Sequence, residues 1–167
     1  MAVDVFAADE QKDEPVDAMR WVRLAEDVLD AEGVKGEVEL SMLFVDEPAI
    51  ADLNERFLGE GGPTDVLAFP MDELLSEGGR SPDSGGTGPG VNPEPTTEAP
   101  TMLGDVVLCP AVARRNARVA SRTYEDEMAL LVVHGILHLL GMDHADADEA
   151  TAMQRREREL LGRFHKS

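Results

Sequence analysis

The chain has 167 residues, of which 43% are hydrophobic, and a formal net charge of −19. This length and hydrophobic content predict a single globular domain with a core of its own. The strong negative charge argues against indiscriminate binding to polyanions, so any contact with a nucleic acid has to be local.

The start of the chain and its cysteine content indicate the cellular compartment in which the protein is expected. Residues 1–15 have no basic start, no long apolar segment and no cleavage-like site, so we expect neither a secretory signal nor a membrane anchor. Cys109 is the single cysteine, which excludes an intramolecular disulfide, and its apolar neighbours predict a buried thiol without a catalytic role. These features predict a cytoplasmic protein that does not bind a membrane.

Hydrophobic periodicity predicts alternating strands and helices over the first 70 residues. The predicted strands are 3–7, 37–45 and 64–70, and the predicted helices are 13–33 and 46–58. Asp46 is the expected cap of the second helix. The first helix is expected to bury one apolar stripe, formed by Trp21, Val22, Leu24, Ala25, Val28 and Leu29.

Residues 76–100 differ from the rest of the chain in composition. Gly, Pro, Ser and Thr dominate the segment, and apolar side chains are almost missing from it. Such a segment cannot form a packed unit. We therefore interpret it as a disordered insertion between two strands, which costs little because loop-closure entropy grows slowly with length.

The second half of the chain predicts one more strand and three helices. The strand is expected at 103–110, and the helices at 111–121, 124–140 and 146–164. The helix over 124–140 is apolar almost all round, with Thr123 as its cap, and is expected to be central and buried. The last helix is amphipathic, with an expected inward face of Ala152, Met153, Leu160 and Leu161. These elements predict an α/β fold with a sheet of about four strands and about five helices.

Three of the four histidines fall within HGILHLLGMDH, as His134, His138 and His144. His134 and His138 are four residues apart, so on a helix they share one face. Gly141 can take the left-handed conformation that reverses the chain and returns His144 to the pair. Three imidazoles that leave one position open are typical of a catalytic zinc site. We predict one Zn²⁺ ion at these histidines, although imidazole also suits nickel, copper and iron.

Gly135 distinguishes this motif from that of the metalloproteases. The spacing matches HExxHxxGxxH, but Gly135 stands where the protease has the glutamate that acts as general base, so a metallopeptidase is the weakest alternative. Gly135 serves either close helix packing or substrate approach. Asp143 is a candidate catalytic proton acceptor, a carboxylate that orients an imidazole, or a helix cap. His165 is interpreted as a solvated tail residue.

A basic stripe precedes the histidine helix. Arg115, Arg118 and Arg122 follow helical spacing, and Arg114 lies beside them. A solvated helix face is the simpler interpretation of this pattern. Contact with RNA phosphates is the alternative, because the stripe lies directly upstream of the histidines.

The motif HGILHLLGMDH, together with GPTDVLAFP and LGDVVLCP upstream, resembles the YbeY family of bacterial ribosomal RNA maturation factors, regarded as single-strand-specific endoribonucleases. The resemblance covers most of residues 35–160. It implies that His134, His138 and His144 are zinc ligands and that the protein acts in ribosomal RNA processing and ribosome quality control. The implied partners are ribosomal RNA and the ribosome or small-subunit ribosomal proteins, and the protein is expected to be a monomer.

The sequence departs from the family at Leu58, where an arginine thought to matter for cleavage is frequent, and at Ala68, where serine is common. Arg56, two positions before Leu58, is the expected catalytic substitute. The expected substrate-binding residues are Thr64, Asp65, Arg114, Arg115 and Arg118. The metal is expected to activate water or to polarise a phosphoryl oxygen.

The low aromatic content of 4% predicts weak intrinsic affinity for single-stranded RNA, so the ribosome is expected to deliver the substrate. The main alternative to an enzyme is a non-catalytic ribosome assembly factor in which zinc only stabilises the fold.

Overall fold

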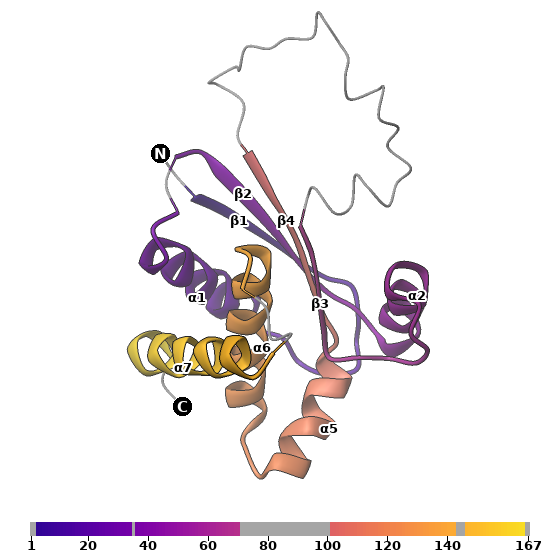
Figure 1. Cartoon of the computed structure of the whole chain (residues 1–167). Helices are drawn as coiled ribbons and strands as arrows, with labels where there is room; N and C mark the ends of the chain where they lie inside the picture. Colours follow the sequence, from indigo (N-terminus) through magenta and orange to yellow (C-terminus); the bar gives the residue numbers. More distant parts are fainter. Residues whose placement is uncertain (1–2, 35, 71–100, 143–145, 166–167) are drawn as a thin grey trace, which may run out of the picture.

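The computed structural model describes residues 3–34, 36–70, 101–142 and 146–165. These ranges form a four-stranded sheet and five helices, as the α/β prediction requires (Figure 1). The strands are β1 (Val3–Asp9), β2 (Val38–Phe44), β3 (Val66–Pro70) and β4 (Thr101–Leu108). The helices are α1 (Ala18–Ala31), α2 (Glu47–Leu58), α5 (Pro110–Ala120), α6 (Tyr124–Leu139) and α7 (Ala147–Phe164). The predicted insertion at 76–100 and two predicted site residues, Asp143 and His144, lie outside the described residues.

The sheet has the strand order β1-β2-β4-β3. Strands β1, β2 and β4 are parallel, whereas β3 lies at the edge and pairs with β4 in antiparallel fashion. Gly104 of β4 pairs with Pro70 and has a φ of 142°. A Cβ atom at Gly104 would lie 2.2 Å from the carbonyl oxygen of Phe69, so only glycine allows β3 to approach here.

Helices cover the sheet on both faces. Alternate side chains of β4 belong to different cores: Val106 and Leu108 pack with α1 and α6, whereas Val107 packs with Ile50 of α2. Helix α7 lies outside this first layer and contacts both α1 and α6 (Figure 1). The buried thiol of Cys109 belongs to the smaller core on the α2 side. Burial raises the pKa of the Cys109 thiol, and the burial itself is the one that the sequence predicts.

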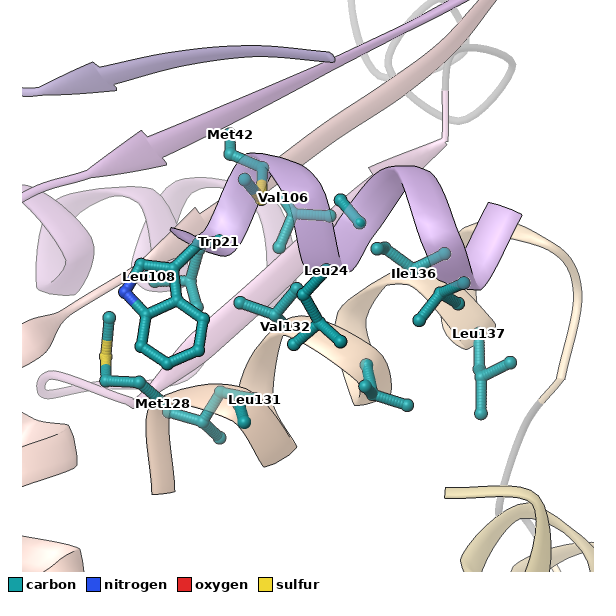
Figure 2. Packing of buried hydrophobic residues seen from close by; sticks show 14 of the residues in the cluster. Trp21, Leu24, Met42, Val106, Leu108, Met128, Leu131, Val132, Ile136 and Leu137 are labelled. Carbon is teal, nitrogen blue, oxygen red and sulfur yellow. The ribbon is translucent and has the colours of Figure 1, made fainter. Parts of the chain in front are cut away.

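Helix α6 is the central buried helix that the sequence predicts. It begins at the predicted cap, where the backbone N–H of Asp126 donates to Oγ1 of Thr123 at 3.0 Å. It ends before Gly141, which has a φ of 101°. Figure 2 shows Trp21 and Leu24 of α1 packed beside Met128 and Val132 of α6. The six predicted inward residues of α1 are all buried.

Two predictions about the C-terminal helix are wrong. Ala152 is exposed, because the inward positions of α7 fall at Met153, Glu157 and Leu160 instead. His165 is not a solvated tail residue, since its side chain is only 8% exposed. Its Nε2 lies 2.8 Å from Oδ1 of Asp126, because α7 packs against α6 and carries the end of the helix to that carboxylate.

Within the described ranges, no helix is both long and apolar enough to cross a lipid bilayer.

Candidate functional site

A cleft with a volume of about 850 Å³ lies between β3, α6 and α7. Edge strand β3 forms one wall, and one whole face of α6 forms the other. The lining residues are Leu58, Asp65, Val66, Leu67, Ala68, Glu127, Leu130, Leu131, His134, Gly135, His138, Gly141, Met142 and Glu157. The cleft therefore collects the histidine motif and the strand that follows GPTD, two segments far apart in the sequence.

Two of the three predicted metal ligands lie side by side in this cleft. His134 and His138 are half-buried, one helical turn apart, with ring centroids 4.7 Å from each other and planes inclined at 78°. The third predicted ligand, His144, lies outside the described residues. Within the ranges that the structure describes, no group of three potential ligands is complete. The structure thus confirms the shared helix face and leaves the third ligand a prediction.

Glu157 of α7 holds one of these imidazoles. Its Oε2 lies 2.5 Å from Nδ1 of His134, and its side chain is 9% exposed. Because a carboxylate accepts hydrogen bonds, the Nδ1–H of His134 donates in this contact, and Nε2 is the ring nitrogen that Glu157 does not engage. The sequence analysis missed Glu157. The available signal was a charged residue at an inward position of α7, between Met153 and Leu160.

Gly135 allows α6 to lie close to the sheet. A Cβ atom at this position would lie 2.7 Å from Cγ1 of Val106 and 3.4 Å from Cγ2 of Val66. Of the two roles that the sequence left open, the geometry supports close packing. The same contact leaves no room for the glutamate of a metalloprotease at this position.

Two further carboxylates line the cleft. Asp65, a predicted substrate-binding residue, accepts a hydrogen bond at 3.1 Å from Nδ2 of Asn116 on α5. The hydroxyl of Thr64 lies 3.5 Å from the same carboxylate, although Thr64 is not among the lining residues. Glu127 is buried and accepts from Nε and Nη2 of Arg122 at 3.1 and 2.8 Å. The sequence analysis did not single out Asn116 or Glu127.

The structure does not bring the predicted RNA-contacting arginines to the cleft. They lie on α2 and α5, outside its described lining: Arg56, Arg114, Arg115 and Arg118. Arg56 forms an exposed ion pair with Asp52 at 3.3 Å. Arg114 pairs with Glu14 at 2.9 Å and lies over the ring of Tyr124, and Arg115 pairs with Glu47. Their substrate contacts therefore stay predictions, and so does the catalytic role of Arg56.

Comparisons with known proteins place this chain in a family. The family described as "Endoribonuclease YbeY" matches residues 6–165. The chain is 51% identical to the endoribonuclease YbeY of Beutenbergia cavernae over 149 residues, which is 89% of either chain. It is 48% identical to that of Thermobifida fusca, over 92% of this chain and 89% of the relative. With the enzyme of Frankia alni the identity is 46%, over 94% and 80% of the two chains.

A solved structure shares the fold. The solution structure of TM1509 from Thermotoga maritima matches with a TM-score of 0.53 and 24% identity, over 95% of this chain and 90% of the other. The family match and the near full-length matches to endoribonucleases define a nuclease of the hydrolase class. The chain belongs to the YbeY family of endoribonucleases, as the sequence motifs indicate.

Proposed function

We propose that this protein is a metal-dependent endoribonuclease that cuts single-stranded ribosomal RNA in the cytoplasm, during ribosome maturation and quality control. Family membership supports the nuclease activity. The observation that carries the metal dependence is the pair of imidazoles, His134 and His138, on one wall of a cleft with a carboxylate behind one of them. The delivery of RNA by ribosomal proteins remains part of this proposal.

The residues of the cleft suit a divalent cation such as Zn²⁺. Glu157 engages Nδ1 of His134, an arrangement that orients an imidazole ligand and raises its basicity. His134, His138 and His144 would hold the ion, with His144 reached through the reversal at Gly141. A bound ion supplies Lewis acidity for hydrolysis of a phosphodiester.

The described carboxylates of the cleft differ in their availability for proton transfer. Glu127 is held by two hydrogen bonds from Arg122, and Glu157 is held by His134. Asp65 accepts hydrogen bonds from Nδ2 of Asn116 at 3.1 Å and from the hydroxyl of Thr64 at 3.5 Å, and neither of these partners is charged. Asp65 is therefore the best placed of the three to accept a proton from an attacking water or hydroxyl group.

The position of the hydrophobic core favours a catalytic metal over one that only stabilises the fold. The main core packs on the side of α6 that faces α1 and the sheet, whereas His134 and His138 line the cleft. Removal of the ion should leave this packing in place. The assembly-factor alternative requires the opposite, because a structural zinc site contributes directly to folding.

The proposal is tested by the cleavage of a single-stranded ribosomal RNA fragment with wild-type protein and with His138→Ala, with bound metal quantified in both. We expect the variant to stay folded, to bind less metal and to lose cleavage by about a hundredfold or more. His165→Gln is the matched control, since His165 lies outside the cleft and should leave metal content and cleavage intact. A wild-type protein that holds metal but cuts nothing, even with ribosomes present, would support the assembly-factor alternative.

A further inference from the structure

The cleft that we propose to hold RNA carries negative charge on its walls. Asp65, Glu127 and Glu157 line it, and its described lining includes neither arginine nor lysine. The chain as a whole adds a net charge of −19. RNA carries one negative charge per phosphate, and proteins hold its backbone with cationic side chains. The described lining therefore offers no cationic side chain to the phosphates of a bound strand.

Most arginines near the cleft are already bound to carboxylates. Arg122 contacts Glu127 of the cleft lining, and both its Nε and its Nη2 are bound to that carboxylate. On α7, Arg156 donates to Glu32 at 2.5 Å and to Glu159 at 2.9 Å. These guanidinium groups offset the charge of the protein's own carboxylates rather than that of a substrate.

Two consecutive residues fix the orientation of α7. Arg156 reaches Glu32 at the end of α1, and Glu157 reaches His134 on α6. Successive side chains of a helix are rotated by about 100°, so Arg158 projects from the flank of α7 opposite to α1.

This flank of α7 faces the cleft. Helix α1 packs on β1, at one edge of the sheet, whereas the cleft lies along β3, at the other edge. Figure 1 shows α7 crossing in front of α6 beside α1. Glu157 of α7 lines the cleft, so the flank next to Glu157 that turns away from α1 lies on the side of the cleft.

The flank has no acidic residue to neutralise Arg158. Helical spacing puts Thr151, Gln154 and the exposed Arg155 on the same side, whereas Glu159 lies on the other side with its partner Arg156. Arg158 is exposed, and no ion pair joins it to a described carboxylate. The cleft-side flank of α7 is thus polar and positively charged beside an acidic cleft, with Thr151, Gln154, Arg155 and Arg158. Of its two arginines, Arg158 follows Glu157 of the cleft lining directly.

We propose that Arg158 binds the RNA backbone at the rim of the cleft, where its guanidinium contacts a phosphate of the bound strand. This inference rests on the proposed nuclease function and names the source of the positive charge for the same site. A guanidinium offers two parallel N–H donors to a phosphate, which fixes the strand as well as attracting it. Arg158 would supply the contact that the described lining of the cleft lacks.

The test compares wild type, Arg158→Ala, Arg158→Lys and Arg163→Ala as full-length proteins. Arg163 is a matched control, because it is exposed on the same helix but projects from the α1 side. Binding of a fluorescently labelled single-stranded RNA is measured by anisotropy at several salt concentrations, together with kcat/KM for its cleavage. Loss of one phosphate contact should reduce the slope of log K against log salt by about 0.7.

Arg158→Ala is expected to weaken binding and kcat/KM by about tenfold and to show the reduced slope. Arg158→Lys should keep the slope, since it retains the charge, and Arg163→Ala should match wild type. Wild-type affinity and slope in Arg158→Ala, with an active wild-type enzyme, would overturn this inference and leave the proposed function intact. Equal losses in Arg158→Ala and Arg163→Ala would also overturn it. A wild type that neither binds nor cuts RNA would overturn both.

Discussion

The two sides of α6 are built from different kinds of residue. On the side that faces α1 and the sheet, Met128, Val132 and Ile136 are fully buried in the main hydrophobic core. On the side that faces the cleft, His134 and His138 are half-buried and polar. Stability and metal binding therefore depend on different sides of the same helix. Substitutions on the first side should change stability, whereas substitutions on the second should change metal binding and cleavage.

The largest expected effect falls on the cleft side. Glu157→Gln removes the negative charge behind His134, and we expect metal affinity to fall by about 10- to 100-fold. Competition with a zinc chelator measures this loss, and fluorescence of Trp21, the sole tryptophan, shows whether unfolding is altered. Glu159→Gln is the control, since Glu159 is exposed on the same helix. Unchanged metal affinity in Glu157→Gln would show that this carboxylate does not serve the site.

A smaller effect is expected where α6 meets the sheet. Gly135→Ala places a methyl group against Val106, so we expect the free energy of unfolding to fall by about 1–3 kcal/mol. Gly162→Ala is the matched control, because nothing lies within 4 Å of its added Cβ on α7. There, better helix propensity should raise stability by about 1 kcal/mol or less. Denaturant unfolding compares the two, and equal shifts would contradict the packing role of Gly135.

The smallest expected effect lies at the start of α6. The hydroxyl of Tyr124 donates to the carbonyl oxygen of Pro15 at 2.8 Å, so Tyr124→Phe should lower the free energy of unfolding by about 1 kcal/mol. Burial, followed by the negative charge of Glu14, raises the pKa of Tyr124. Below the ordinary tyrosine pKa of about 10 both folded and unfolded states keep the proton, and above it the unfolded state loses the proton first.

Tyr124 should therefore contribute a loss of stability as the pH rises above about 10, and this part of the loss should be missing in Tyr124→Phe. Because Tyr124 is the only tyrosine, the ultraviolet absorbance of the phenolate reports its ionisation directly. Ionisation of the folded protein at the ordinary tyrosine pKa would contradict the burial of this hydroxyl.

Local chemistry explains why most of the fold could be predicted. The cap at Thr123 and the glycine at Gly141 act within one helical turn, so the sequence around them contains the whole signal. The apolar stripe of α1 is also a local pattern. The antiparallel pairing of β3 at the sheet edge was not predicted, because strand order depends on partners distant in the sequence.

The parts of the site that the sequence did not reveal depend on long-range contacts. Glu157 meets a histidine 23 residues away, and Asn116 meets a carboxylate 51 residues away. His165 appeared to be a tail residue because its partner, Asp126, is 39 residues earlier. The helical spacing of Arg115 and Arg118 was correct, but spacing does not show that Arg115 pairs with Glu47.

The most direct test of the division between the two sides of α6 is to measure unfolding and RNA cleavage on the same preparation before and after a chelator removes its metal. We expect the stripped protein to unfold cooperatively and to lose cleavage by about a hundredfold or more, with recovery after Zn²⁺ is added back. A stripped protein that no longer folds would show that the metal maintains the structure. Cleavage that continues without metal would contradict the catalytic role of the histidines.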